Sequence, residues 1–165
     1  MQISLGVEWA AHAASLLASL PEGMGLRAEA LAVFHGVPQA YMAKQMQALS
    51  KAGLVRTSRG RQGGYRLAKP AEEITLWDIT AAIEGKGPAF TCTEIRQNGP
   101  CGAKPADCKK ACGIAAAFGK AESAFRTTLE AQTLADLLED VVADSTAKQL
   151  RKTEIWLETQ AVAIG

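Results

Sequence analysis

Apolar residues recur with helical spacing along the first fifty positions of the chain. One face of residues 5–20 is apolar and the other polar, which predicts a helix there. The apolar face holds Val7, Ala10, Ala14 and Leu17, and the polar face holds Glu8, His12, Ser15 and Ser19. Similar spacing predicts helices over residues 26–34 and 38–51, with Gly36 as the C-terminal cap of the first of these two.

The pattern changes to that of two short strands after residue 53. Residues 54–57 and 65–67 flank a glycine-rich turn, which predicts a β-hairpin with a basic tip. Gly63 and Gly64 are expected to take positive φ angles, so that the hairpin reverses sharply and approaches another backbone closely.

Helical periodicity returns after the hairpin. Thr75 is expected to cap a helix over residues 76–83, and the capping-box spacing of Thr133 and Asp136 predicts a further short helix through Leu138. Between these two helices, an apolar stripe predicts one long helix, which we expect to pair with a second subunit. This stripe consists of Ile114, Phe118, Ala121, Phe125 and Leu129, and a last helix is expected around Ile155, Trp156 and Leu157.

Together these elements predict a mainly α-helical fold with a small β-hairpin wing, that is, a winged helix-turn-helix plus a long dimerisation helix. We divide the chain into a winged-helix DNA-binding domain at residues 1–86 and a cysteine-containing cluster loop at residues 87–112. A dimerisation helix at residues 113–132 and a C-terminal helical tail at residues 133–165 complete it.

The composition adds a charge pattern to this picture. Of 165 residues, 48% are hydrophobic and 21% charged, which is typical of a globular protein. The N-terminus lacks a signal-peptide pattern and no apolar run is long enough to span a membrane, so a cytoplasmic protein is expected. The net charge of +1 hides a basic segment, because residues 38–66 contain no acidic residue, whereas acidic residues outnumber basic ones from Glu122 onward. The basic segment is expected to attract a polyanion.

The order helix, helix, turn, helix, basic hairpin is that of a winged helix that reads double-stranded DNA. The third helix is expected to reach base edges or phosphates, and the hairpin to follow the minor groove. The candidate DNA contacts are Arg27, Gln39, Tyr41, Lys44, Gln45, Arg56, Arg59 and Arg61. A solvated basic face on a protein-binding domain is the alternative, and the agreement of charge, helix order and glycine-rich hairpin favours DNA with a palindromic operator.

All four cysteines lie in one segment, at Cys92, Cys101, Cys108 and Cys112. In a reducing compartment such clustering favours metal binding or redox chemistry over structural disulfides. The absence of a Cys-x-x-Cys pair makes zinc a minority interpretation. Cys108 and Cys112 are four residues apart, and Pro105 before them is suited to open a helical turn that directs both thiols the same way.

Several motifs resemble the winged-helix regulators typified by IscR and NsrR, homodimers that sense iron-sulfur status, nitric oxide or redox state. They are LSKAGLV at 49–55, RGRQGGYRLA at 59–68, ITLWDI at 74–79, IEG at 83–85 and TLADL at 133–137. The resemblance covers roughly the first 140 residues. Within the family, GVEWAAH at 6–12 is most similar to the RsrR-like redox sensors.

This resemblance implies a 2Fe-2S cluster as cofactor and iron ligands shared between two subunits. IscR-like members use a histidine three residues after the last cysteine, where this chain has Ala115, and NsrR-like members use an aspartate where it has Glu8. RsrR-like members imply Glu8 and His12 from one subunit and two cysteines from the other, for which we take Cys108 and Cys112. Cys92 and Cys101 are then alternative ligands, spare thiols or a reversible disulfide. Without the resemblance, Glu8 and His12 would simply belong to the polar face of the first helix.

The sequence therefore predicts a dimeric, repressor-like transcription regulator and not an enzyme. Trp9, beside a proposed ligand, is a candidate redox-coupled switch or an ordinary packing residue, and His35 is structural or faces a phosphate. A cluster-free thiol sensor or a zinc-stabilised regulator of the same fold is the alternative. An oxidoreductase is disfavoured because the chain has neither a nucleotide-binding glycine motif nor a Cys-x-x-Cys pair.

Overall fold

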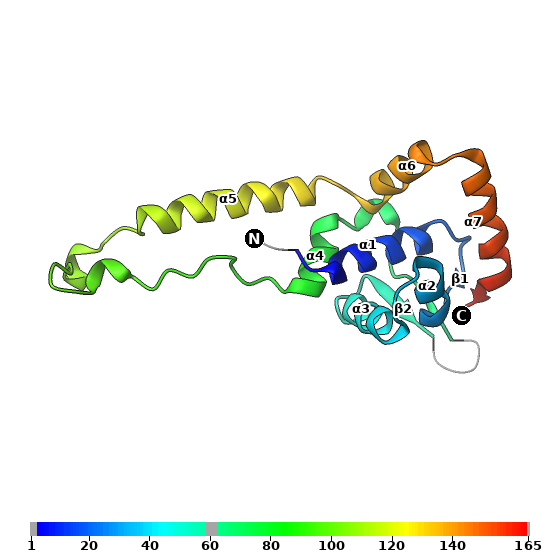
Figure 1. Ribbon diagram of the computed structural model, residues 1–165, viewed down its shortest axis with the longest axis horizontal. Helices are drawn as coiled ribbons and strands as arrows, with labels where there is room; N and C mark the ends of the chain where they lie inside the picture. Colours follow the sequence, from blue (N-terminus) through cyan, green and yellow to red (C-terminus); the bar gives the residue numbers. More distant parts are fainter. Residues whose placement is uncertain (1–2, 59–62, 165) are drawn as a thin grey trace.

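The computed structural model describes residues 3–58 and 63–164 and consists of a helical body with one long arm (Figure 1). The helices are α1 (Leu5–Ala18), α2 (Ala28–His35), α3 (Gln39–Lys51), α4 (Leu76–Glu84), α5 (Gly113–Glu130), α6 (Leu134–Asp144) and α7 (Ala147–Gln160). The strands are β1 (Met24–Gly25), β2 (Val55–Thr57), β3 (Tyr65–Leu67) and β4 (Val162–Ala163). Short 3-10 turns lie at η1 (Ala71–Glu73), η2 (Ile95–Gln97) and η3 (Pro105–Asp107). Every helix in the described ranges is too short or too polar to cross a bilayer.

Helix α1 is the centre of the body. It contacts α3, α4 and α6, and its inward face carries small residues that let these helices approach closely. The fully buried large side chains of the core come from the surrounding elements and include Leu26, Leu31, Met42, Met46, Leu49, Ile74, Ile79 and Leu134. Burying such aliphatic side chains is the main source of folding free energy, so the position of α1 fixes that of the helices around it.

The predicted hairpin is confirmed, and its backbone is joined to more of the chain than the sequence indicated. Strands β2 and β3 pair antiparallel, and β3 is joined through a Leu26–Tyr65 bridge to the segment that carries β1. Strand β1 pairs in turn with β4 near the C-terminus, a pairing that the sequence pattern did not predict. Arg59 and Arg61 lie outside the described residues. The base of the wing is thus held by both the N-terminal and C-terminal parts of the chain.

The expectation for Gly64 of the hairpin is half right. Gly64 is not among the glycines with positive φ, so the expected backbone conformation is wrong for this residue. The close approach is present, because a Cβ at Gly64 would lie 3.0 Å from the Leu26 carbonyl oxygen. Gly64 is therefore required for the packing of the hairpin against residue 26 and not for a left-handed turn.

Two capping boxes meet at the base of the arm. Thr75 and Asp78 cap α4 reciprocally, Thr133 and Asp136 cap α6 in the same way, and the two threonines form an antiparallel bridge. On either side of the bridge, the Leu76 amide donates to the Gln132 carbonyl at 2.9 Å and the Leu134 amide donates to the Ile74 carbonyl at 2.7 Å. We call this pairing of residues 74–76 with 132–134 the clasp, because the arm leaves and re-enters the body there.

The helix predictions are confirmed apart from one or two residues at their ends, the usual uncertainty of helix boundaries. Gly36 caps α2 in the left-handed conformation, as expected. The helix after Thr133 extends to Asp144 and is longer than the short helix expected.

We predict that Thr133→Ala lowers the free energy of unfolding by about 1 kcal/mol, the usual cost of losing an N-cap. The Thr133 hydroxyl and amide lower the pKa of Asp136, so the capping box is intact at neutral pH and its contribution is lost as the pH falls through that lowered pKa. Urea denaturation at neutral and acidic pH measures both effects. Thr128→Ala, within exposed α5, is the matched control and should change stability little; equal effects of the two substitutions would contradict the role of the clasp.

Candidate DNA interface and cysteine site

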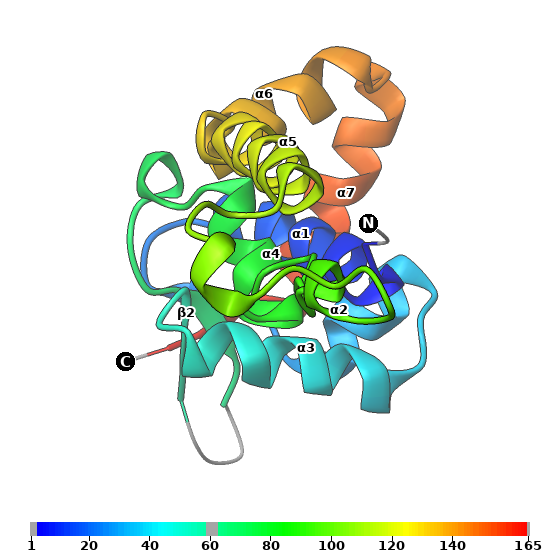
Figure 2. The same ribbon diagram turned by 90° about the vertical axis from the view of Figure 1, so that its left-hand side faces the viewer.

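The third helix and the hairpin share one side of the body. Figure 2, a view along the arm, shows α3 and the β2–β3 hairpin on the side opposite α5 and α6. Between the start of α2, α3 and the hairpin lies a groove of about 790 Å³. Polar and basic residues line most of it, among them Arg27, Gln39, Gln47, Ser50, Lys51 and Thr57. Glu29 also lines the groove, but its many polar groups together with Arg27 and Lys51 suit it to a phosphodiester backbone.

Two arginines lie directly opposite each other on the hairpin. Arg56 on β2 pairs in register with Arg66 on β3, and like charges at this position are unfavourable in an isolated hairpin. The Nε atom of Arg66 is buried without a hydrogen-bond partner in the part of the chain that the structure describes. An anion that bridges the two guanidinium groups would relieve both costs, which supports Arg56 and adds Arg66 as a candidate contact.

The structure supports some of the candidate contacts and corrects one. Gln39, Tyr41 and Lys44 are exposed on α3, where they can reach a ligand. Gln45 is wrong as a DNA contact, because its side chain is buried with that of Met42 and lies against Gly6 of α1. Its spacing from Met42 and Leu49 is that of the buried face, a signal available in the sequence. Gln47, on the opposite face, lines the groove and was missed.

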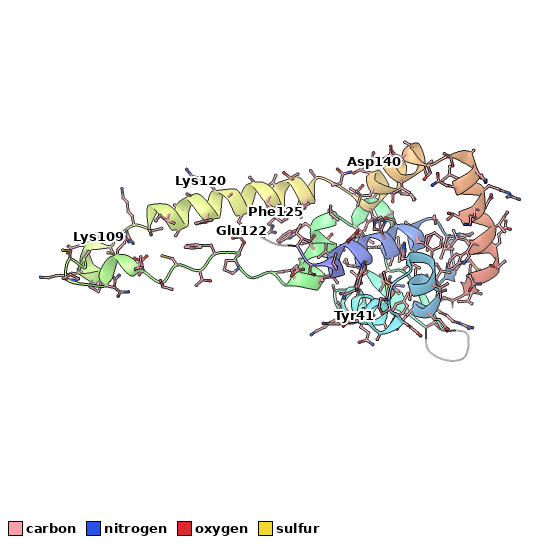
Figure 3. All side chains as sticks on the ribbon, in the orientation of Figure 1. Tyr41, Lys109, Lys120, Glu122, Phe125 and Asp140 are labelled. Atoms are coloured by element: carbon pink, nitrogen blue, oxygen red, sulfur yellow. The ribbon has the colours of Figure 1, made fainter. Side chains whose placement is uncertain are left out.

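The cysteines lie at the far end of the arm, where Lys109 is labelled in Figure 3. We call residues 92–112 the cysteine tip. Cys112 is buried, Cys92 and Cys108 are half-buried, and Cys101 is exposed. Farther back along the arm, the Glu122 carboxylate on α5 accepts from the Ala89 amide at 3.1 Å and ties the two sides together. Phe90 and Phe118 stack there with ring centroids 4.6 Å apart.

Cys112 is the N-cap residue of α5. The side chain makes no capping hydrogen bond, but the nearby backbone N–H groups of Ala115 and Ile114 lower the pKa of the thiol, with a smaller contribution from the positive charge of Arg96. Free amides at a helix N-terminus favour an anion, and here they favour the thiolate, the form of cysteine that binds metals.

The expected helical turn through both cysteines is wrong in part. A 3-10 turn does begin at Pro105, but it ends at Asp107, and Cys108 follows it in irregular backbone. Cys108 and Cys112 therefore flank a loop and are not successive residues on one helical face. The proline and glycine residues that precede them break the periodicity on which the i, i+4 argument depends.

Glu8 and His12 do share one face of α1, as predicted, and both are exposed. They line a hollow of about 490 Å³ between α1 and α6. The opposite wall of this α1–α6 hollow carries Asp140 and Asp144, which the sequence analysis did not single out. In Figure 3, Asp140 lies over the body, far from Lys109 at the tip.

Two aromatic contacts lie behind these residues. The His12 ring lies 5.7 Å from that of His35, and burial and then the charge of His12 lower the pKa of His35. His35 is packed within the body, which agrees with its structural interpretation. Trp9 is half-buried and meets the edge of Tyr41 on α3, with ring centroids 6.0 Å apart, so α1 and the candidate DNA-reading helix are in side-chain contact.

The proposed ligands form two separate groups in one chain. Glu8 and His12 lie on the body, whereas the cysteines lie at the end of the arm, and the length of α5 separates the arm tip from α1 (Figure 1). Within residues 3–58 and 63–164, three or more His, Cys, Asp or Glu side chains do not converge on a possible metal position. A mixed-ligand site therefore requires two chains.

Comparison with known proteins relates this architecture to one family. A family model described as Rrf2, iron-dependent transcriptional regulator, matches residues 3–140. Protein aau3 of Rhizobium meliloti (strain 1021) is 39% identical over 106 residues, which are 63% of this chain and 64% of that protein. The match thus spans less than two thirds of that relative's length.

Two solved structures share the fold. IscR of T. potens superposes with a TM-score of 0.65 at 22% identity, over 92% of this chain and 96% of that one. The oxidized form of Staphylococcus aureus CymR superposes with a TM-score of 0.60 at 26% identity, over 84% of this chain and 97% of that one. The mainly α-helical winged fold predicted from the sequence is confirmed.

We predict that Lys44→Ala and Arg56→Ala each weaken binding to duplex DNA and reduce the slope of log affinity against log salt by about 1, because each removes one phosphate contact. Fluorescence anisotropy with an operator selected from a random duplex library measures both quantities. Gln45→Ala is the control: it should lower stability through a cavity beside Gly6 and leave the salt slope unchanged. Unchanged affinity and slope in both basic variants would show that DNA binds elsewhere.

Proposed function

The chain belongs to the Rrf2 family of transcriptional regulators, and we propose that it is a DNA-binding regulator and not an enzyme. We further propose that it senses redox state through a 2Fe-2S cluster shared by two subunits. Glu8 and His12 of one subunit and Cys108 and Cys112 of the other are the proposed iron ligands. The cluster, when bound, supplies a centre that gains or loses one electron and so changes charge between the subunits.

One observation carries this proposal: the chain presents two incomplete halves of a site. The cysteine tip offers thiols, with the thiolate of Cys112 favoured by helix amides. The α1–α6 hollow offers a carboxylate and an imidazole four residues apart on one helical face. Thiolates match iron, and histidine and carboxylate can complete such a site, so the donor set fits the cluster once two chains are combined.

Charge complementarity supports the pairing of tip and hollow. Lys104, Lys109 and Lys110 give the cysteine tip a positive charge, and the hollow carries Asp140 and Asp144 beside Glu8. Among the described residues, none of these lysines or aspartates has an ion-pair partner in its own chain. In a two-fold dimer, the tip of each arm would meet the hollow of the other subunit, and both halves would be completed at once.

The apolar stripe of α5 supports the same arrangement. Ile114 and Phe118, near the tip, are 62% and 52% exposed, whereas Phe125 and Leu129 are half-buried near the body. Helix α5 contacts α4 of its own chain, so the stripe is part intramolecular, which corrects the expectation that all of it pairs with a second subunit. The exposed outer half would be covered by the arm of the partner.

Helix α1 would carry the signal to DNA. Its outward face holds Glu8 and His12, and the intervening Trp9 contacts Tyr41 on α3. A change in cluster charge would alter how α1 is held between the subunits, and the Trp9–Tyr41 contact would pass that change to α3. We therefore retain Trp9 as the proposed redox-coupled switch.

A cluster-free thiol regulator is the second candidate, favoured by one observation. The lowered pKa of Cys112 favours its thiolate, the form that reacts with oxidants, without any metal. Visible and electron-spin resonance spectra of protein purified without oxygen distinguish the two. A colourless protein whose DNA binding is lost on oxidation and restored by a thiol reductant would replace the cluster proposal by this one.

We predict that Lys109→Glu with Lys110→Glu weakens dimerisation at least tenfold, because like charges then face Asp140 and Asp144. Asp140→Lys with Asp144→Lys should do the same, and the chain carrying all four substitutions should return to within about threefold of the original dissociation constant. Sedimentation equilibrium measures each constant, at low and high salt.

Lys120→Glu, an exposed charge reversal elsewhere on α5, is the matched control and should have little effect (Figure 3). An unaltered parent that is monomeric at micromolar concentration would overturn the dimer itself. A dimeric parent with unaltered constants in every variant would overturn only the pairing of tip and hollow.

We predict that Cys112→Ala and Cys108→Ala lose the visible cluster absorption after reconstitution without oxygen, and that Glu8→Ala and His12→Ala weaken it strongly. Cys101→Ala should be unaffected because its side chain is exposed. Cys92→Ala tests which cysteine is the second iron ligand beside Cys112. If this variant loses the absorption and Cys108→Ala keeps it, the second ligand is Cys92 and not Cys108. Retained clusters in both the Glu8 and His12 variants would indicate a cysteine-only site.

A further inference from the structure

Glu94 has an unusual backbone conformation within the cysteine tip. Its φ of 51° makes it the one non-glycine residue with positive φ in the ranges that the structure describes. For a residue with a Cβ this left-handed conformation costs of order 1–3 kcal/mol, and it persists where surrounding contacts impose it. The hydrogen bonds of the Glu94 carboxylate are the contacts that offset this conformational cost.

The Glu94 carboxylate holds the Arg96 guanidinium. The Arg96 Nε and Nη2 atoms donate to Glu94 Oε2 at 3.0 and 2.6 Å. The same Nη2 also donates to the Lys110 carbonyl at 3.1 Å. Arg96 thus connects η2 to the segment just before α5, across the tip, through a donor group whose planar shape suits two acceptors at once.

One thiol contacts this pair, and two more flank the residue whose carbonyl Arg96 binds. The Cys92 thiol donates to the other carboxylate oxygen, Glu94 Oε1, at 3.7 Å. The Lys110 carbonyl that Arg96 holds lies midway along the chain between Cys108 and Cys112. The hydrogen bonds that Arg96 donates to Glu94 are the main cause that raises the pKa of Arg96. Its positive charge in turn helps to lower the pKa of the Cys112 thiol.

The backbone of the tip is closed around the same point. The Ala103 amide donates to the Arg96 carbonyl at 2.9 Å. A Cβ at Gly102 would lie only 2.5 Å from the Gln97 carbonyl oxygen, so this close approach requires glycine. Cys101, just before this contact, remains exposed. The tip is an ordered unit built around residues 94 and 96.

We propose that the Glu94–Arg96 pair positions the thiols of the cysteine tip and supplies the positive charge next to the cluster site. Arg96 is a positioning residue and not an iron ligand. Arg96 is proposed to order the cysteine tip even when no metal is bound. Its proposed effect on the reduction potential of the cluster rests on the function proposed above. Groups that orient metal ligands and place charge near a cluster are known to tune such sites.

The charge and the shape of Arg96 have separate consequences. The charge stabilises the reduced cluster, which is the more negative form, so its removal should make reduction less favourable. The planar fork bridges Glu94 and Lys110, and a lysine ammonium would keep the charge but lose this bridge. Comparing Arg96→Lys with Arg96→Gln therefore separates the two roles.

The first measurement uses the protein without metal. Hydrogen exchange of the amides in residues 101–112 should accelerate about tenfold or more in both Arg96 variants, with the core of the body unchanged. Arg151→Gln, which breaks an exposed ion pair with Glu154 on α7, is the matched control and should leave the tip unchanged. Unchanged exchange of the tip in both Arg96 variants would overturn the positioning role, whether or not a cluster exists.

The second measurement is a dithionite titration of reconstituted protein followed by visible absorption. Arg96→Gln should shift the equilibrium toward the oxidised cluster about tenfold, which is about 59 mV for a one-electron couple, and Arg96→Lys should shift it much less. A parent that assembles no cluster would overturn the proposed function, and the exchange data would still decide the positioning role. A parent with a cluster and equal potentials in all variants would overturn the role of the charge.

Discussion

The clasp at the base of the arm is the constraint on which the rest of the structure depends. Residues 74–76 and 132–134 are joined by two backbone hydrogen bonds beside reciprocal capping boxes. Because Ile74 and Leu134 are fully buried beneath it, the clasp is anchored in the core of the body. Some fifty residues can therefore leave the body and return without loosening it, since closing a long loop costs little more than closing a short one.

A fixed base also gives the arm a direction. Helix α5 begins directly after its cap residue Cys112 and leads back to the clasp. The Glu122–Ala89 hydrogen bond and the Phe90–Phe118 stack join it to the outgoing segment. The arm is thus a two-sided element that holds the cysteine tip away from the body. A flexible loop would let the thiols reach α1 of their own chain, whereas this arm keeps the two ligand groups apart and leaves their combination to a second subunit.

The sequence predicts the body better than the tip, for physical reasons. Helical periodicity identifies α1 to α4 because each buries an apolar face, and it identifies α5 by an apolar stripe that its own chain covers only in part. The threonine caps carry their own local signal. The β1–β4 pairing joins residues far apart in the chain and involves two residues on each side, too few for a pattern. The Glu94–Arg96 pair depends on one left-handed residue in irregular backbone. The spacing of apolar residues gives no prediction for such a segment. Gln45 is an error of another kind. Its amide suggested a contact with DNA bases, although its position on the helix already indicated that it is buried in the core.

A site divided between two chains links three equilibria: cluster binding, dimerisation and DNA binding. A cluster that needs donors from both subunits would stabilise the dimer by its own binding free energy, since a single chain offers only half of the ligands. The dimer in turn sets the distance between the two copies of α3, and a two-fold operator is bound well at only one distance. A coupling of about 1–3 kcal/mol between cluster state and subunit arrangement would change DNA affinity by about 5-fold to 150-fold. Such a coupling requires no new contact with DNA, because each α3 already packs against the α1 that carries Glu8 and His12.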